Sequence, residues 1–426
     1  MDDREMAREV ARRVAEQGGR AYYVGGFVRD GLLGIENKDV DIEVHGISHG
    51  CLTRILEELG QVLSMGESFG ILGLRGYALD IAMPRKETLR GTGHKDFEVF
   101  VDPFIGTEAA ARRRDFTVNA LMEDVLTGEI LDHFGGKADL EAGILRHVSA
   151  ESFGEDPLRV LRCAQFAARF GFRTAEETLN LCRGMSLEHL PRERIEGELK
   201  KALLKGEKPS VFFRTLREMD QLELWFPELK ALIGVGQNPK YHAEGDVWEH
   251  TMLVLDAAAA LRHRAKEPYS FMMAALVHDL GKAVCTEEKN GVLHAYHHEE
   301  AGVPLAGALV SRITGETRVR DYALNMVKLH MKPNTMAGAG SAEKSTTRLF
   351  DASVDPEGLI LLALADHRGR ILEQDPGDHE RWLYRRLEIY RERMAAPYVM
   401  GRDLIEAGLK PGPAFTEVLA YAGKKK

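Results

Sequence analysis

The stretch that most restricts the fold of this chain is residues 23–46, YVGGFVRDGLLGIENKDVDIEVHG. An apolar run ends in the pair Gly25-Gly26 and an apolar helical period follows at once, which predicts a strand, a tight turn and a helix. Glycines in such a turn let backbone N–H groups approach a ligand, and the start of a helix behind them favours an anion. Arg29 can add a charge contact. A plain turn is the alternative, because the sequence is neither a Walker A loop nor GxGxxG.

Two carboxylates, Asp39 and Asp41, lie in the second half of this stretch, where polar and apolar residues alternate. Residues i and i+2 of a strand share a face and lie about 7 Å apart. Such a pair can converge on one or two hard cations, and an oxygen-only ligand set suits Mg²⁺. Two ions can stabilise both the attacking and the leaving oxygen of a phosphoryl transfer. An exposed edge strand with solvated acids is the alternative, and the nearby glycine turn favours the metal site.

The patterns along the chain divide it into a mixed first part and a helical remainder. From Arg20 to about Phe134, short apolar strands alternate with helices, and beyond that the pattern is almost wholly helical. The expected fold class is therefore α+β (multidomain), with a small mixed β-sheet followed by all-α domains. The net charge of −9 at pH 7 argues against indiscriminate nucleic-acid binding but allows a local basic groove.

Neither a membrane span nor a secretory signal is expected. No stretch approaches the ~20 apolar residues of a span, and the amphipathic amino end lacks the apolar core of a signal peptide. The four cysteines are scattered and form no CxxC pair, which argues against a thiolate metal site or a disulfide framework. We therefore expect a cytoplasmic protein with no membrane partner. The sequence leaves the oligomeric state open.

Two further segments of the first part can contribute to a phosphate site. Residues 77–82, YALDIA, predict a third strand that presents Asp80 beside the strand of Asp39 and Asp41, with a surface acid as an equal alternative. Residues 85–97 are polar and glycine-bearing. They predict a loop of the kind that closes over substrates, although most polar loops have no such role.

Three consecutive arginines, Arg112, Arg113 and Arg114, precede an apolar run. They are too costly to bury unpaired, so they either line a solvated face or bind an anion. Arginine forks match phosphate oxygens bidentately, and the carboxylate strand favours the anion site. Asp115 and Asn119, four residues apart, are expected on one face of a helix.

Residues 155–162, EDPLRVLR, carry the most specific chemistry of the helical part. Asp156 suits the N-cap and Pro157 the first helical position, so a well-capped helix is the plain interpretation. Asp156, Arg159 and Arg162 also recur every three residues along one stripe. A carboxylate acceptor beside a guanidinium donor can match the amino group and ring nitrogen that cytosine and adenine share, whereas guanine and uracil present the opposite polarity.

Candidate metal ligands of a different kind follow residue 240. They are His250 on an apolar helix, the adjacent His278-Asp279 after an apolar run, and Asp366. A lone histidine on an apolar helix is more often a satisfied core residue, but the HDLGK context favours a ligand. Imidazole and carboxylate together suit Mn, Fe, Ni, Zn or similar ions.

In this order, GGFVRDGLLG with DVD, RRRDFTVNAL and EDPLRVLR resemble the tRNA nucleotidyltransferases (CCA-adding enzymes) and bacterial poly(A) polymerases of the second class, over residues 20 to about 230. The resemblance implies a nucleotidyltransferase head, a neck, a body and a tail. It also implies addition of C, C and A to tRNA 3′ ends from CTP and ATP, with Mg²⁺ as cofactor. The predicted site residues are Asp39 and Asp41 for the metal ions, with Asp80 as a catalytic position at which members differ; Gly25, Gly26, Arg29, Arg112, Arg113, Arg114, Asp115 and Asn119 for the nucleotide; and Asp156, Arg159 and Arg162 for the base.

The histidine set resembles the HD-domain metal phosphohydrolases, whose ligands follow the order His, His-Asp, Asp. His298 and His330 resemble the extra histidines of members with two metals, and His297 competes with His298 for one position. The resemblance implies a divalent transition metal (Ni, Mn, Fe or similar) and a phosphatase or 2′,3′-cyclic phosphodiesterase activity. The intact ligand set favours a working hydrolase over a degenerate scaffold.

The predicted domains are a head at 1–135, a neck with base recognition and RNA binding at 136–235, an HD domain at 236–372 and a helical tail at 373–426. Basic residues of the neck, between Arg192 and Lys208, are interleaved with glutamates. They can contact tRNA phosphates or form an ordinary solvated helix face. The alternative functions are an enzyme that adds only CC, only A or poly(A), and a mainly HD-type phosphohydrolase with an RNA-binding amino half.

Overall fold

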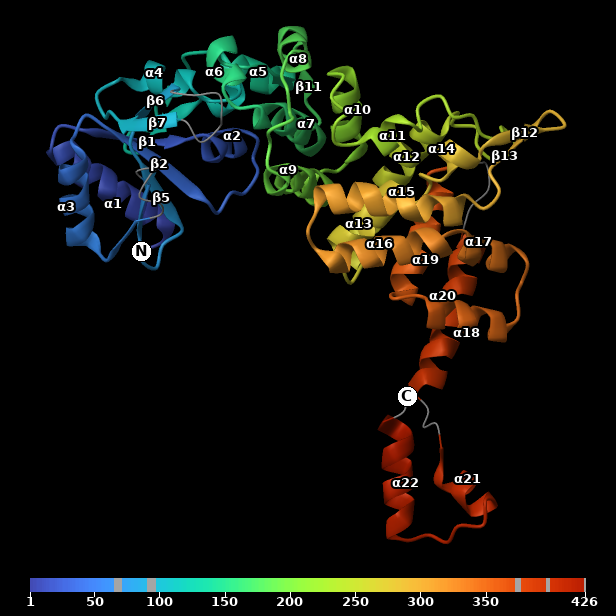
Figure 1. The fold of residues 1–426 in the computed structure, drawn as a ribbon. Coiled ribbons are helices and arrows are strands. Elements are labelled where there is room, and N and C mark those ends of the chain that lie inside the picture. The colour runs from blue at the N-terminus through green and yellow to red at the C-terminus, as the bar shows by residue number, and fades with distance from the viewer. Residues whose placement is uncertain (65–70, 90–96, 372–376, 396–398, 425–426) are drawn as a thin grey trace. The chain divides into compact units, whose positions relative to one another are not determined.

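The computed structural model describes residues 1–64, 71–89, 97–371, 377–395 and 399–424. Within this part of the chain, contacts divide the protein into two compact units, Met1–Pro227 and Glu228–Lys426 (Figure 1). The first unit combines a β-sheet with helices, and the second is almost entirely helical. This confirms the expected α+β, multidomain fold class.

The first unit is built on a seven-stranded mixed sheet with the strand order β3-β4-β5-β2-β1-β8-β9. Strand β2 pairs antiparallel with β1 and parallel with β5. The central strands read RAYYV and VDIEVH, which are rich in β-branched and aromatic residues that favour strands. The strands are β1 (Arg20–Val24), β2 (Val40–His45), β3 (Val62–Ser64), β4 (Leu72–Leu74), β5 (Leu79–Ala82), β8 (Met122–Asp124) and β9 (Ile130–Leu131).

Helices cover both faces of this sheet. They are α1 (Asp3–Glu16), α2 (Gly26–Leu32), α3 (His49–Leu59) and α4 (Thr107–Arg112). On one face, Tyr23 lines a pocket together with arginines of α1. On the other face, Tyr22 belongs to a buried cluster that includes a residue of α4. Because Tyr22 lies opposite Glu43 in the ladder, and Asp41 shares a face with Glu43, the carboxylate of Asp41 lies on the face away from α1.

The rest of the first unit is helical apart from a short parallel pair of strands, β10 (Ile144–Leu145) and β11 (Arg173–Thr174). Helix α7 is central to it, because it packs against both α9 and α10 and buries most of its side chains. The helices are α5 (Gly136–Ala142), α6 (Ala150–Gly154), α7 (Leu158–Phe170), α8 (Glu176–Arg183), α9 (Arg192–Lys205) and α10 (Ser210–Glu218), with α11 (Pro227–Lys230) at the boundary of the units.

Helix α13 lies at the centre of the second unit, and its residues 269–277 are all buried. Helices α12, α15, α16 and α19 pack against it. The residues that follow α13, His278 and Asp279, therefore lie in the interior of the unit. The elements are α12 (Val247–Leu261), α13 (Pro268–Val277), α14 (Lys282–Cys285), β12 (Glu287–Lys289), β13 (Val292–His294), α15 (His298–Ile313), α16 (Thr317–Leu329), α17 (Met331–Gly338), α18 (Glu343–Ala352), α19 (Pro356–Arg368), α20 (Gly377–Ala395), α21 (Gly401–Glu406) and α22 (Pro413–Lys424), with a 3-10 helix at Arg262–Arg264.

Two local predictions differ from the structure. The segment expected as a polar loop contains strands β6 (Arg85–Leu89) and β7 (Phe97–Val101), which pair antiparallel, while residues 90–96 lie outside the described residues. The sequence FEVFV at its end favours a strand. Closure over a substrate stays a prediction.

The second difference concerns Asp115 and Asn119, which were expected on one helix. Helix α4 ends at Arg112, and a separate 3-10 helix covers Thr117–Asn119. The carboxylate of Asp115 accepts the N–H of Phe116, a local bond that competes with helix formation. The two side chains nevertheless touch, because Asn119 Nδ2 donates to Asp115 Oδ1 over 2.9 Å.

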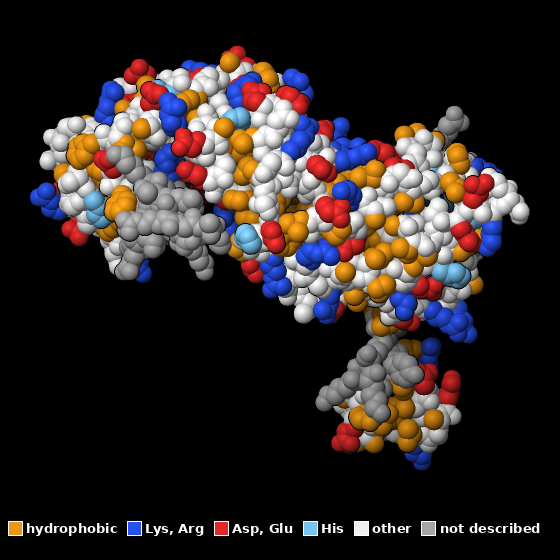
Figure 2. All heavy atoms as spheres, turned by 45° about the horizontal axis from the view of Figure 1, so that its top comes forward, with side chains coloured by type: hydrophobic (Ala, Val, Ile, Leu, Met, Phe, Trp, Pro, Cys, Tyr) orange, Lys and Arg blue, Asp and Glu red, His pale blue; other side chains and the backbone are white. Residues whose placement is uncertain are grey.

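Three further observations, on membrane-spanning helices, surface charge and domain boundaries, apply to all the described residues. None of its helices is long and apolar enough to cross a membrane. On the face drawn in Figure 2, Lys and Arg side chains are interspersed with Asp and Glu. The boundaries of the four predicted domains stay predictions, because the contacts separate the chain only near residue 227.

Candidate functional site

The carboxylates of the first unit lie together on neighbouring strands. Asp41 of β2 and Asp80 of β5 are direct partners in the parallel ladder, and Asp39 immediately precedes β2. Burial raises the pKa of Asp41 to about 6, and the negative charges of Asp80 and Asp39 act in the same direction against Arg114. Asp41 is partly buried, whereas Asp39 and Asp80 are exposed. Neighbouring carboxylates that repel one another fit a divalent cation, which relieves the repulsion.

The glycine turn lies beside these carboxylates. Gly25 has a φ of +64°, which favours glycine, and a Cβ there would lie 3.0 Å from Nη1 of Arg114. Arg114 Nη2 lies 3.4 Å from Glu43 Oε2 on the strand of Asp41. The turn and a guanidinium therefore meet at the carboxylate strand, and a side chain at Gly25 would push them apart.

The three consecutive arginines have different surroundings. Arg114 lies at the carboxylate strand, as described above. Arg112 is exposed and pairs with Glu108 of its own helix over 2.7 Å. Arg113 donates to the carbonyl of Arg85 at the start of β6. The structure thus brings one of the three to the turn.

Arg29 is 3% exposed, and its bonds are made inside the protein. Its Nε donates to Asp30 Oδ1 over 2.8 Å, and Nη1 donates to Asn119 Oδ1 over 2.5 Å. Its guanidinium carbon also lies 5.1 Å and 4.5 Å from the ring centres of Phe166 and Phe170 on α7. The side chain therefore connects α2 to α7 in this conformation.

Asp115 continues this buried connection to the predicted base-reading helix. Arg162 of α7 donates from Nε to Asp115 Oδ2 over 2.8 Å. Burial alone would raise the pKa of Asp115, but the charge of Arg162 and the hydrogen bond from Asn119 hold it below the ordinary value. The Asp115 carboxylate is therefore charged at neutral pH and joins the 3-10 helix to α7.

Removal of one partner tests this ion pair. Arg162→Met should lower the free energy of unfolding by about 3 kcal/mol, because it leaves the carboxylate of Asp115 buried without its counter-charge. Denaturant unfolding measures the loss. The double variant Asp115→Asn/Arg162→Met should be more stable than Arg162→Met, and equal stability of the two would show that the stranded charge is not the cause.

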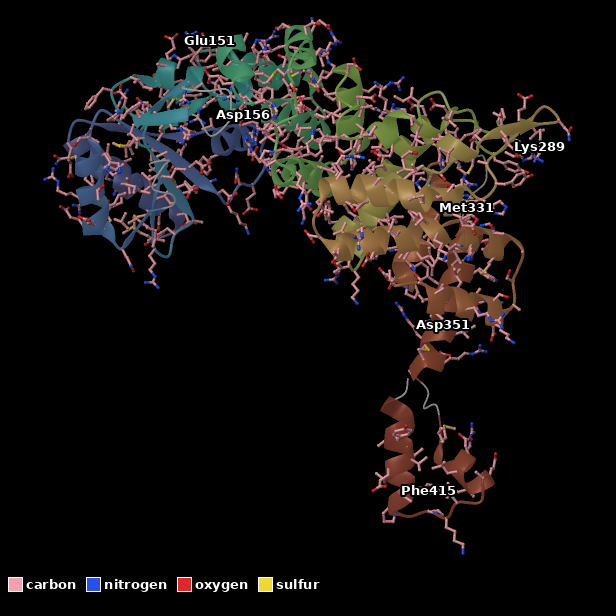
Figure 3. All side chains as sticks on the ribbon, in the orientation of Figure 1. Glu151, Asp156, Lys289, Met331, Asp351 and Phe415 are labelled. Carbon is pink, nitrogen blue, oxygen red and sulfur yellow. The ribbon has the colours of Figure 1, made fainter. Side chains whose placement is uncertain are left out.

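The predicted base-reading pair lies at the amino end of α7, where Asp156 is labelled in Figure 3. Asp156 Oδ1 accepts the N–H of Leu158 over 3.1 Å, and Oδ2 is 2.9 Å from Nη2 of Arg194 on α9. Arg159 donates from Nη1 and Nη2 to the carbonyls of Ser152 and Arg113. Base reading by this pair therefore requires an exchange of some of these bonds.

The second unit gathers six predicted metal ligands, all at most 5% exposed. Asp279 lies at their centre. Its Oδ2 is 3.2 Å from His278 Nε2 and 3.5 Å from His250 Nε2, whereas its Oδ1 is 3.2 Å from His298 Nε2 and 3.5 Å from His330 Nε2. Ligand atoms therefore form two groups that share Asp279, an arrangement that can hold two ions.

The sixth ligand and two cations complete the cluster. Asp366 Oδ1 lies 3.1 Å from His250 Nε2, and its Oδ2 lies 2.7 Å from Arg370. Lys282 Nζ lies 2.7 Å from Asp279 Oδ2. Among the described residues, however, Nε2 of His278 and both oxygens of Asp279 are buried without a partner in hydrogen-bond geometry. Such unsatisfied atoms fit metal ligands, so the residues present suit the metal that an HD domain implies.

Two sequence details become clear in this cluster. His298 lies among the ligands, whereas the side chain of the competing His297 is 82% exposed. A Cβ on Gly281 of the HDLGK segment would lie 1.9 Å from the carbonyl oxygen of His298. Only glycine allows this approach, which brings the His278-Asp279 turn against the start of α15.

Sequence reasoning missed two neighbours of the cluster, His242 and Glu244. Glu244 Oε1 lies 2.7 Å from His242 Nδ1 and 2.9 Å from His250 Nδ1. Both precede α12 in a segment with loop composition. The available signal was the alternation of His and Glu six to eight residues before the first ligand.

Comparison with known proteins gives three matching family models. "Poly A polymerase head domain" matches residues 21–146, "Probable RNA and SrmB- binding site of polymerase A" matches 171–233, and "HD domain" matches 247–370. The Thermotoga maritima CCA-adding enzyme complexed with tRNA has a TM-score of 0.61 and 22% identity, and the match covers 97% of this chain and 88% of that one. The Bacillus stearothermophilus CCA-adding enzyme in complex with CTP gives the same two values, with coverages of 100% and 93%. The fold is therefore that of CCA-adding enzymes.

Curated relatives establish the family. The multifunctional CCA proteins of Haemophilus ducreyi and of Actinobacillus pleuropneumoniae serotype 5b are 40% and 39% identical to this chain over 363 and 364 residues. In each case the match covers 82% of this chain and 85% of the relative. The resemblance inferred from the ordered sequence motifs is thereby confirmed, and the chain belongs to the multifunctional CCA proteins, nucleotidyltransferases that also carry an HD domain.

Proposed function

We propose that this chain adds C, C and A to the 3′ end of tRNA, with CTP and ATP as the nucleotide donors. The 3′ hydroxyl of the RNA attacks the α-phosphate, and pyrophosphate leaves. The observation that carries the proposal is the pairing of Asp41 with Asp80 across β2 and β5, with Asp39 beside them and Arg114 at the glycine turn. These groups supply a cation site next to an anion site, as nucleotidyl transfer requires.

The carboxylates of Asp39 and Asp41 would hold Mg²⁺, with Asp80 as a third carboxylate. Mg²⁺ bound there supplies charge stabilisation for the attacking and leaving oxygens. The turn at Gly25 and Gly26 leads directly into α2, and the backbone N–H groups and dipole at the start of a helix favour a phosphate. Arg114 adds a guanidinium at the same turn.

The remaining residues predicted for nucleotide binding fall into two groups, those that contact the base and those that support the pocket. Asp156 and Arg159 are proposed to read the amino group and ring nitrogen of cytosine or adenine. Arg29, Asn119, Asp115 and Arg162 form the buried hydrogen-bonded series described above, so we assign them to shaping the pocket and holding α7. Arg112 and Arg113 immediately precede Arg114, and we assign them to the conformation of this segment or to RNA contact.

Incorporation of labelled nucleotides tests the proposal. With Mg²⁺, CTP and ATP, tRNA that lacks its terminal CCA should gain three nucleotides, and tRNA that ends in CC should gain one from ATP alone. Incorporation of CTP only, of ATP only, or of a long run of A would identify a specialised enzyme or a poly(A) polymerase instead. No incorporation of either label would contradict nucleotide transfer.

A second activity is proposed for the HD domain because its six ligands converge on one buried place. His250, His278, Asp279 and Asp366 would hold one divalent transition metal, and Asp279 with His298 and His330 a second. Lys282 and Arg370 add positive charge beside these ligands, which suits a phosphate substrate. We therefore propose phosphohydrolysis, as a phosphatase or a 2′,3′-cyclic phosphodiesterase. Metal analysis and hydrolysis of 2′,3′-cyclic AMP test it.

A further inference from the structure

The ring orientations of the histidines in the HD cluster are set by their Nδ1 atoms. Three of them bond the backbone carbonyl three residues earlier: His278 to Ala275 over 2.8 Å, His298 to Ala295 over 2.8 Å and His330 to Val327 over 2.7 Å. Since a carbonyl only accepts, each Nδ1 carries the proton. Each Nε2 is then a lone-pair donor that faces Asp279, which is the tautomer that a metal ligand needs.

His250 differs from these three, because its Nδ1 faces a carboxylate. Glu244 Oε1 lies 2.9 Å from His250 Nδ1, while His250 Nε2 faces Asp366 at 3.1 Å. The side chain of Glu244 is 1% exposed. A buried carboxylate that accepts from the distal nitrogen of a ligating histidine fixes its tautomer and raises its basicity.

Glu244 also joins two ligand-bearing helices. It precedes α12, which carries His250, and its Oε2 accepts the N–H of Ile371, just beyond α19, which carries Asp366. His242 Nδ1 shares Oε1 with His250 at 2.7 Å. One carboxylate therefore contacts both the distal nitrogen of His250 and the segment that follows α19.

Another interpretation of the same atoms is a separate ion held by His242, Glu244 and His250, whose ligand atoms are close enough for one. Such an ion would need the Nδ1 of His250 as a ligand while its Nε2 serves the HD cluster. The ring would then have to lose its last proton. A hydrogen bond from His250 to Glu244 requires no such loss, so it is the arrangement that the chemistry favours.

We propose that Glu244 is a positioning residue of the HD metal centre, and that it strengthens metal binding by orienting and polarising His250. His242 supports it by donating to the same carboxylate oxygen. This inference rests on the phosphohydrolase centre proposed above. Glu244 is proposed to act through His250 and not by direct contact with the metal or the substrate. The measurement that reports its role is therefore the affinity of the centre for a metal ion.

The test measures metal binding by the purified full-length chain. The protein is stripped with a chelator, and Mn²⁺ is titrated against a competing indicator. Outer carboxylates of this kind are typically worth about 10- to 100-fold in metal affinity, so Glu244→Gln should weaken binding by that factor. His242→Ala should weaken it less, because His242 acts through Glu244. The exposed Glu288 of β12 provides a matched control, and Glu288→Gln should leave the affinity unchanged.

The outcomes separate this inference from the function on which it rests. If the wild-type chain binds no Mn²⁺ or other divalent ion, the metal centre itself is wrong. If the wild-type chain binds metal and Glu244→Gln binds it equally well, only the role of Glu244 is wrong. Thermal unfolding of the stripped proteins checks that the variant is folded. Should Glu244→Gln be unfolded, Glu244→Asp, which keeps the charge but shortens the side chain, should fold and show the weaker binding, and unchanged affinity there also overturns the proposal.

Discussion

Asp41→Asn should lower nucleotide addition by at least about 10³-fold, since the loss of one ligand carboxylate removes several kcal/mol of charge stabilisation at the reacting phosphate. Asn keeps the size of the side chain but removes its charge, and Asp41 is less exposed than Asp39 and Asp80. The rate of CTP incorporation into tRNA lacking CCA measures the loss. Hydrolysis of 2′,3′-cyclic AMP by the same variant should be unchanged.

A surface acid of the same unit serves as the control for this prediction. Glu57 lies on the exposed side of α3, and Glu57→Gln should add nucleotides at the wild-type rate. Normal addition by Asp41→Asn would place the metal site elsewhere. Loss of both activities would instead indicate that the variant does not fold.

The strand faces that carry the carboxylates of the first unit could be predicted from the sequence, because they depend on short-range patterns. Alternation assigns side chains to the two faces of a strand, and this is how Asp80 could be placed beside Asp41. A helical pattern also predicted α7, which begins within a residue of the expected position. The face of each strand and the start of the helix depend on residues within a few positions of one another, whereas the pairing of β2 with β5 joins distant segments of the chain.

The surroundings of Arg29 could not be predicted in the same way. Its partner Asn119 lies ninety positions away, and the rings beside it belong to α7. A sequence shows that a guanidinium is present at a glycine turn, but tertiary contacts decide whether its donors face a ligand or the protein. For the same reason the sequence predicts a shared role for the three adjacent arginines, although they contact three different partners.

The HD cluster was also only partly predictable, because some of its contacts join distant parts of the chain. The resemblance to HD-domain phosphohydrolases pointed to six residues, and the structure brings all six together. Glu244 and His242 lie in a stretch whose glycines and polar residues resemble a plain loop. Glu244 accepts the N–H of Ile371, more than a hundred residues later in the chain, and local sequence patterns do not predict such a contact.

Asp279→Asn should lower hydrolysis of 2′,3′-cyclic AMP by about 10³-fold and reduce the metal content of the purified protein. Its two oxygens face different histidine pairs, so the substitution removes the charge that both groups of ligand atoms share. CTP and ATP incorporation should be retained, because the carboxylates proposed for transfer belong to the first unit.

Neighbouring histidines offer a matched control for this second loss. His298→Gln should weaken metal binding, since its Nε2 lies 3.2 Å from Asp279 Oδ1, whereas His297→Gln should not, since that side chain is exposed. Equal behaviour of the two variants would contradict the ligand assignment. Hydrolysis that survives Asp279→Asn would show that the cluster is a structural scaffold, and the nucleotidyltransferase assignment would stand without it.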